Sequence, residues 1–412
     1  MKPIYIVSWL FALAVSFVSC DDWLDKTPKD RLYPDVYFKT EDELRLFTNQ
    51  FYNNLVPSAV DIYSESSDLI VKSDLMLEMS GQRIIPDEGN GWNFTALRDI
   101  NFYLQYSHNC TEVNARNRYD GVARFFRAYF YFEKVKRYGD IPWYDKALDS
   151  DDPELYKARD SREFVMQKML EDLDFAIANL PKTKNAYVLT RWTALALKSR
   201  VCLFEGTFRK YHGLEDCEKY LNACVSASET FMNESGYTLY KSGSTPYRDL
   251  FASINLQADE VIFGRDYEAS LSVLHNVQNY ENSTTMGRPG MNKKIVNSYL
   301  MAAGSRFTDK AGYETMTFDQ ECQNRDPRLA QTIRTPGYTR IGSTKKEAPN
   351  LAYTMTGYHL IKYSMTANYD EYNKSCNDIP LFRTAEVYLN FAEAKAELGT
   401  LKQADINKSI KL

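Results

Sequence analysis

The hydrophobic pattern of this chain is clearest in residues 121–142, where apolar positions follow one another with almost no polar face between them. The aromatic side chains of this stretch are Phe125, Phe126, Tyr129, Phe130, Tyr131 and Phe132. A helix that is apolar on nearly every side has to be buried among other helices. Lys136 and Arg137 add positive charge in the last turn, Gly139 suits a left-handed cap, and Pro142 blocks continuation. The pattern therefore predicts a buried central helix.

Further helices are predicted where capping residues precede apolar positions at helical spacing. Thr40 with Glu43 starts one that Pro57 stops, and Asp160 with Glu163 starts another that ends before Pro181. Other helices are expected at 96–107, from the cap Thr190 to Gly206, and at 214–232, 381–398 and 403 onward. Because consecutive helices joined by short turns form hairpins that stack, the fold class is mainly α. The arrangement is similar to tetratricopeptide repeats, although the repeat consensus is absent.

Residues 236–378 follow a different pattern, since Gly, Pro, Ser, Thr and Tyr are frequent there. Short apolar runs at 261–264 and 358–363 are typical of isolated strands. We expect a helical scaffold that carries a long, irregular, loop-rich excursion over 236–378. Long loops on a rigid scaffold commonly carry binding residues.

The chain begins with Lys2 and an apolar run from Ile4 to Val18, which ends at Ser19 and Cys20. A charged start, a short apolar stretch and a small residue before the cut are typical of an export signal, predicted over residues 1–19. Cys20 stands where a bacterial lipoprotein is cleaved and acylated with fatty acids such as palmitate, so it is the predicted lipidation site. Residues 20–412 then form a single domain that begins with a tether at 21–40. A short membrane anchor is the alternative reading of the apolar run.

Composition limits the classes of function. A net charge of -5 without a basic cluster argues against a nucleic-acid partner. The four histidines are scattered, and neither a nucleophile elbow nor a phosphate-binding loop occurs, so no catalytic residue, metal ligand or cofactor is predicted. The acidic run 149–154 lacks the alternation of a calcium loop and is interpreted as a solvated loop. Glu171, Asp172 and Asp174 are interpreted as the polar face of a helix.

Six further cysteines follow Cys20, and none has metal-ligand spacing. Cys202 and Cys224 fall in apolar helical patterns, where a free thiol behaves as a small hydrophobic group. An exported protein could also pair its cysteines, so both states stay open.

The best candidate for a binding site is the run Gly91-Trp92-Asn93-Phe94, which lies between a Gly-rich loop and a helix. An exposed Trp offers an apolar plate to a sugar ring, and an amide can hydrogen-bond its hydroxyls. The predicted ligand-binding residues are therefore Trp92, Asn93 and Phe94, with Tyr280 as a second candidate. A Trp92 ring packed in the core is the alternative.

Four segments resemble the SusD/RagB family of nutrient-binding outer-membrane lipoproteins. The first two are Arg127-Ala128-Tyr129 closing on Tyr138-Gly139-Asp140-Ile141-Pro142, and Asn324-Arg325-Asp326-Pro327-Arg328-Leu329. The others are the run from Leu381 to Ala394 and the start Cys20-Asp21-Asp22-Trp23-Leu24-Asp25. Together they span the chain in the order expected for the family.

The resemblance implies a SusD-like α-helical fold and a non-catalytic, surface-exposed lipoprotein anchored in the outer membrane. Such a protein captures oligosaccharides and delivers them to a SusC-like TonB-dependent transporter. Intact members run further, so the chain is expected to be cut short at Leu412. Three alternatives stay open: a peptide-binding uptake lipoprotein, a surface lipoprotein glycosidase, and a helical scaffold that binds only protein.

Overall fold

The computed structural model describes residues 37–63, 68–86, 89 and 91–411. The predicted signal peptide 1–19, the lipidation site Cys20 and most of the tether lie outside these residues. The end of the tether, however, is described. Phe38 is fully buried and packs with its ring edge against Phe47 and Tyr103. The folded core therefore includes a residue that precedes helix α3 (Glu41–Leu55).

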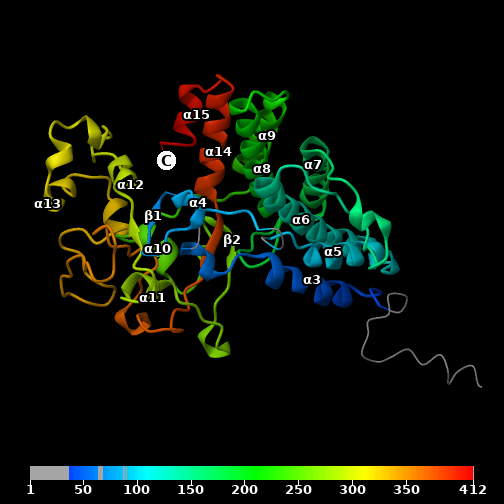
Figure 1. The fold of residues 1–412 in the computed structure, drawn as a ribbon, viewed down its shortest axis with the longest axis horizontal. Coiled ribbons are helices and arrows are strands. Elements are labelled where there is room, and N and C mark those ends of the chain that lie inside the picture. Colours follow the sequence, from blue (N-terminus) through cyan, green and yellow to red (C-terminus); the bar gives the residue numbers. More distant parts are fainter. Residues whose placement is uncertain (1–36, 64–67, 87–88, 90, 412) are drawn as a thin grey trace, which may run out of the picture.

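The protein is mainly helical, as the pattern predicted, and its long helices occupy one half of the molecule (Figure 1). Helix hairpins α6–α7 and α8–α9 pack side by side, and α14 packs against both helices of the second hairpin. This half comprises α3 (Glu41–Leu55), α5 (Thr95–Tyr106), α6 (Val113–Tyr138), α7 (Arg162–Asn179), α8 (Arg191–Tyr211), α9 (Cys217–Glu234), α14 (Thr384–Glu397) and α15 (Gln403–Asn407).

Local capping explains where several of these helices begin. The Thr40 hydroxyl accepts a hydrogen bond from the backbone N–H of Glu43, and Thr190 caps α8 in the same way. The prediction that Asp160 caps α7 is wrong, because Ser161 is the capping residue. The Asp160 carboxylate instead accepts a hydrogen bond from the backbone N–H of Trp143 at 2.7 Å. Its side chain thus fixes the loop that precedes α7.

Two predicted helix boundaries are corrected by the structure. The central helix α6 begins at Val113, upstream of the apolar stretch, and Arg118 and Tyr119 near its start contact the Glu41 carboxylate of α3. Helix α8 does not end at Gly206 but continues to Tyr211. A Cβ atom on Gly206 would lie 2.7 Å from Leu221 Cγ, so the glycine permits α8 and α9 to pack closely. Packing, rather than capping, explains this glycine.

The start of the predicted helix 381–398 is also wrong. Residues Ile379–Arg383 form the strand β4, which pairs antiparallel with β2 (Val261–Arg265). Helix α14 begins only at Thr384, directly after the strand. The prediction of a strand at 261–264 is confirmed by β2. This two-stranded sheet lies between the helical half and the rest of the molecule (Figure 1).

The other half of the molecule is built from short elements around a second core. The run 358–363, which was expected to be a strand, instead forms isolated bridges, from His359 to Gly290 and from Leu360 to Ile333. The elements here are α10 (Pro246–Ala252), α11 (Val277–Asn282), α12 (Lys293–Ser298), α13 (Phe318–Glu321) and the paired strands β1 (Ile70–Val71) and β3 (Gly290–Met291). The connecting segment between α3 and α5 also contains α4 (Leu77–Ser80).

A buried ion pair joins the central helix to its neighbours. Arg127 on α6 donates two hydrogen bonds to the Asp172 carboxylate on α7, at 2.7 and 2.8 Å, and a third to Asn101 Oδ1 on α5 at 3.2 Å. Asp172 is only 2% exposed, so its assignment to a solvated helix face is wrong. The ion pair accounts for a polar residue in an otherwise apolar part of the chain.

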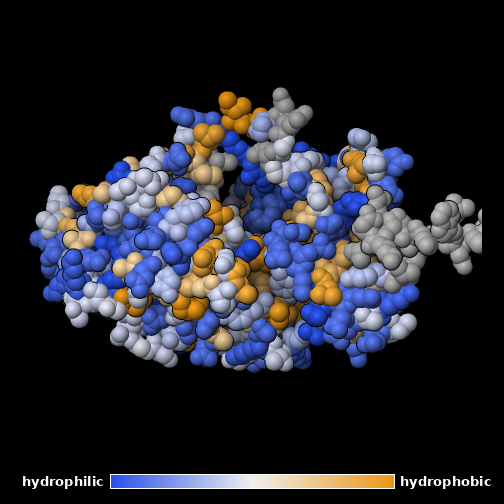
Figure 2. All heavy atoms as spheres, turned by 90° about the horizontal axis from the view of Figure 1, so that it is seen from below, coloured by the Kyte–Doolittle hydropathy of each residue, from blue (hydrophilic) through white to orange (hydrophobic). Residues whose placement is uncertain are grey.

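Figure 2 shows the underside of the molecule as it is oriented in Figure 1. Seen from below, it is mostly hydrophilic, and hydrophobic residues gather near its middle (Figure 2). Within residues 37–63, 68–86 and 91–411, no helix combines the length and apolar content needed to cross a membrane.

Candidate functional site

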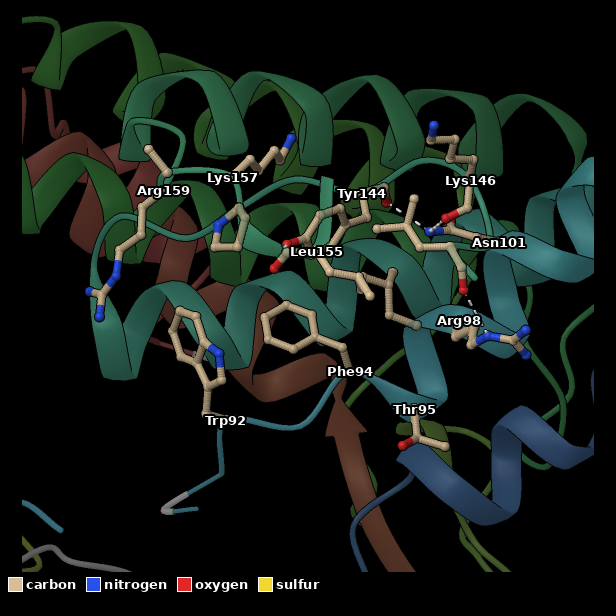
Figure 3. Close-up of a pocket in the computed structure, with 14 residues that line it drawn as sticks. Trp92, Phe94, Thr95, Arg98, Asn101, Tyr144, Lys146, Leu155, Lys157 and Arg159 are labelled. Carbon is tan, nitrogen blue, oxygen red and sulfur yellow. Dashed lines mark hydrogen bonds between the residues drawn. The ribbon is translucent and has the colours of Figure 1, made fainter. Parts of the chain in front are cut away.

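A pocket of about 510 Å³ opens at the start of α5, where the loop 142–159 folds back over the helix. Trp92 and Phe94 lie on one side of it, and Tyr144 and Leu155 lie on the other (Figure 3). The residues that line it are Trp92, Phe94, Thr95, Leu97, Arg98, Asn101, Pro142, Tyr144, Lys146, Leu148, Leu155, Lys157, Ala158 and Arg159. The lining is aromatic and aliphatic inside, with cationic side chains around it.

Trp92 is held at the edge of this pocket with its side chain 40% exposed. Gly91 has a φ of +85°, and a Cβ there would lie 3.2 Å from the Tyr138 hydroxyl, so any other residue before the Trp would be strained. The indole meets the rings of Tyr138 and Phe94 edge to face, with centroids 4.9 and 5.3 Å apart. Trp92 is thus braced but not buried, which contradicts the alternative of a core ring.

Of the two residues that follow Trp92, Phe94 lines the pocket and Asn93 does not. Phe94 is half-buried and lines the pocket, with its ring against those of Phe130 and Tyr144. Asn93 does not line the pocket, and its Oδ1 accepts a hydrogen bond from the backbone N–H of Thr95 at 2.8 Å. This amide therefore serves the start of α5, because the first turn of a helix leaves backbone N–H groups unpaired.

The far wall is fixed by hydrogen bonds to the central helices. The Tyr131 hydroxyl accepts a hydrogen bond from the backbone N–H of Tyr144 at 2.6 Å. Asn101 donates from Nδ2 to the carbonyl oxygens of Tyr144 and Lys146, at 2.8 and 3.3 Å. Because Asn101 also accepts a bond from Arg127, the pocket wall is tied to the buried ion pair. These bonds fix the position of the pocket wall relative to the central helices.

Four cationic side chains line the pocket. Lys157 donates to the Trp143 carbonyl oxygen at 2.6 Å, and its ammonium lies 5.1 Å from the ring centre of Tyr144. The Arg159 guanidinium lies 5.0 Å from the centre of the Trp92 ring. Arg98 and Lys146 are the other two. Burial raises the pKa of the Tyr144 hydroxyl above its ordinary value, so it stays a neutral donor.

Tyr280 is not brought near these residues. It lies on α11, is half-buried and packs against the second core. The structure therefore brings together Trp92 and Phe94 but not Tyr280, and Asn93 is adjacent to the pocket without lining it.

The acidic run 149–154 is partly engaged in local contacts. Lys146 lies 3.4 Å from the Asp152 carboxylate and 3.1 Å from that of Glu154. Within the described part of the chain, no group of three or more His, Cys, Asp or Glu side chains is placed to hold a metal ion. Cys202 and Cys224 are buried and free, and burial raises the pKa of the Cys224 thiol to about 11.

The sequence patterns did not predict the wall of the pocket that the loop 142–159 provides. Tyr144, Lys157 and Arg159 come from a loop whose path over α5 is set by the folded chain. The one available signal was the basic pair Lys157 and Arg159 in an otherwise acidic and polar stretch, together with an aromatic residue soon after the central helix.

Comparison with known proteins connects these features to a family. The SusD family model matches residues 250–412. A second model, described as starch-binding associating with outer membrane, matches residues 81–191, which include most of the pocket. The SusD-like protein P2 of Formosa agariphila is 25% identical over 94% of this chain and 76% of its own length.

Solved structures agree on the fold. A SusD-like protein from Bacteroides fragilis has a TM-score of 0.73 and 21% identity, over 94% of this chain and 80% of that one. A SusD-like carbohydrate binding protein from the same organism also has a TM-score of 0.73, at 19% identity, over 91% of this chain and 78% of its own. With both family models in chain order, the relative along nearly the whole chain and the shared helical fold, the chain belongs to the SusD-like family.

Proposed function

We propose that this chain is a non-catalytic glycan-binding protein of the cell surface, and that its binding site is the pocket beside Trp92. The observation that carries the proposal is an exposed, braced indole at the edge of a preformed aromatic pocket. Sugar rings present apolar faces that stack on such side chains, while nearby polar groups hydrogen-bond their hydroxyls. A family relative described as carbohydrate binding supports the same ligand class.

The pocket lining argues against a glycosidase. Glycoside hydrolysis ordinarily needs two carboxyl groups that flank the scissile bond. None of the residues that line the pocket is Asp or Glu. Its chemistry therefore suits retention of a glycan rather than cleavage. A peptide ligand is the second candidate, because an apolar pocket with cationic edges also accepts peptide side chains.

Binding arrays test the ligand class. We expect the purified protein to bind members of a glycan array and to ignore a peptide array of similar size. Incubation with a bound oligosaccharide, followed by chromatography, should return it uncut. Binding restricted to peptides would contradict the proposal. So would catalytic production of shorter sugars in molar excess over the protein.

The cellular setting of this proposal is the outer membrane. Acylation at Cys20 would anchor the protein at the surface, where it would pass captured oligosaccharide to a SusC-like TonB-dependent transporter. The description of the second family model, associating with outer membrane, supports this location. More than one acyl chain is needed for stable anchoring, since each buried methylene contributes about 0.8 kcal/mol.

Replacement of the predicted lipidation site tests the anchor. We expect Cys20→Ala to move the protein from the membrane fraction to the soluble fraction and to abolish labelling with palmitate. A matched Ser19→Ala variant should keep both properties. Membrane retention of Cys20→Ala with undiminished palmitate label would show that the anchor lies elsewhere.

A further inference from the structure

Arg159 differs from the other cations of the pocket in its lack of an anionic partner among the residues that the structure describes. Within the described residues, no Asp or Glu carboxylate lies within salt-bridge distance of its guanidinium, although acidic residues are close in sequence. The Asp160 carboxylate forms a salt bridge with the Lys157 ammonium at 3.0 Å and accepts a hydrogen bond from the backbone N–H of Trp143. Asp140 accepts a hydrogen bond from the backbone N–H of Arg162 at 2.8 Å. In the part of the chain that the structure describes, no carboxylate therefore compensates the positive charge of Arg159.

The other three cations are each near a carboxylate. Lys146 lies between Asp152 and Glu154, and Lys157 pairs with Asp160. The Arg98 guanidinium is 3.8 Å from the carboxylate of Asp149. All of these carboxylates lie outside the lining of the pocket, so every charged side chain that lines it is cationic.

The position of the Arg159 side chain suits recognition of an anion. Its guanidinium lies beside Trp92 (Figure 3), where the indole holds it through a cation–π contact. It makes one long hydrogen bond, 3.4 Å from Nη1 to the carbonyl oxygen of Tyr138. Because a guanidinium has five N–H donors in a planar fork, most of its donors remain available to a carboxylate or sulfate.

We infer that the ligand of this pocket is an acidic glycan, whose carboxylate or sulfate group is bound by Arg159 while a sugar ring contacts Trp92. This inference rests on the proposed function and narrows its substrate class. A carboxylate and a sulfate both present paired, negatively charged oxygen acceptors, to which the Arg159 guanidinium can donate hydrogen bonds. The Trp92 ring and the Phe94 wall supply the apolar contact, so affinity requires both the charge and the ring.

Size-matched oligosaccharides test the inference directly. Calorimetric titration would compare galacturonic acid oligomers, sulfated galactose oligomers and neutral galactose oligomers. We expect at least one acidic series to bind about tenfold or more tightly than the neutral one. Arg159→Gln should remove that preference, and Arg159→Lys should keep part of it, because the lysine retains the charge but loses the fork.

Arg45→Gln is the matched control, since it removes the same guanidinium charge from a residue that does not line the pocket and is already paired with Asp42 at 3.0 Å. It should change affinity by about twofold or less. Equal affinity for neutral and acidic oligomers, unchanged in Arg159→Gln, would overturn the inference and leave glycan binding intact. Failure to bind any glycan would overturn the proposed function, and the inference with it. Preference for one acidic series over the other identifies which anion is bound.

Discussion

Arg127 shows at the level of single residues how the pocket depends on the core. Its guanidinium lies between the Asp172 carboxylate and the Asn101 amide, and Asn101 in turn holds the pocket wall. Both charges are nearly inaccessible to water, at 7% and 2% exposure. Removal of one partner from such a pair leaves an uncompensated buried charge, which costs more than the pair itself contributes.

Asp172→Asn should therefore lower the free energy of unfolding by about 3 to 5 kcal/mol. Two residues along the same helix, Asp174 pairs with Lys198 at the surface, with its side chain 59% exposed. Asp174→Asn is thus a matched control and should cost less than about 1 kcal/mol. Urea unfolding measures both variants. If Asp172→Asn and Asp174→Asn lowered the free energy of unfolding by similarly small amounts, the ion pair of Arg127 with Asp172 would not be what holds the helices together.

Some of these residue roles could be predicted from sequence and others could not. Trp92 and Phe94 carry local signals, namely the glycines before them and the helix after them. Arg159 carries only the weak signal of a basic pair with Lys157, because its place beside Trp92 depends on a loop held by hydrogen bonds from Asn101. Asp172 was misassigned because its partner Arg127 lies 45 residues away on another helix.

At the scale of elements, the contact between α8 and α9 depends on a single glycine. A Cβ added to Gly206 would lie 2.7 Å from Leu221 Cγ and 3.1 Å from the Leu221 backbone nitrogen. Neither atom is the end of a flexible side chain. The helices would have to move apart to accept it.

Gly206→Ala should consequently destabilise the protein by about 1 to 2 kcal/mol, although alanine is the better helix former by about 1 kcal/mol. In a Leu221→Ala background the same change should cost less, because the nearest clash is gone. Thermal unfolding of the four proteins forms a double-mutant cycle. A single Gly206→Ala variant that is as stable as the parent would mean that the helices are not in tight contact here.

Helices with local caps could be predicted well, as α3 and α8 show. Strand β4 could not, because an apolar run followed by a helix resembles a helix start, and its partner β2 is more than a hundred residues earlier. The excursion could be recognised by composition, but its second core could not. That core is assembled from short elements whose contacts are long-range.

For the molecule as a whole, two buried histidines link stability to pH. His359 accepts a hydrogen bond at Nδ1 from the Asn350 N–H, at 3.2 Å, and its Nε2 lies 2.7 Å from the Glu281 carbonyl oxygen. Burial, with Arg334 nearby, lowers the pKa of His359 to about 3. Burial likewise lowers the pKa of His275 to about 4. Both rings are therefore neutral in the folded protein at neutral and mildly acidic pH.

As pH falls below 6.5, the unfolded chain takes up protons on these histidines while the folded protein does not. Their contribution to stability should be full above pH 6.5 and decrease toward pH 4. Burial raises the pKa of Asp378 to about 6, which has the opposite effect between pH 6 and 4 and offsets part of the loss. Urea unfolding at pH 7.5 and 5 should show a net loss of stability. Imidazole NMR signals of His359 or His275 that titrate near pH 6.5 would contradict this account.

The central claim, that the chain binds glycans at the pocket beside Trp92, is tested most directly by Trp92→Ala. Titration with a glycan found by array should show affinity reduced roughly five- to a hundredfold, since a stacked indole contributes about 1 to 3 kcal/mol. Tyr156→Ala is the control, because this ring is 86% exposed close by and does not line the pocket. It should leave affinity unchanged, and neither variant should shift the melting temperature much. Unaltered affinity in Trp92→Ala would contradict the claim. So would a loss of about 3 to 5 kcal/mol in the free energy of unfolding, which is typical of a core Trp.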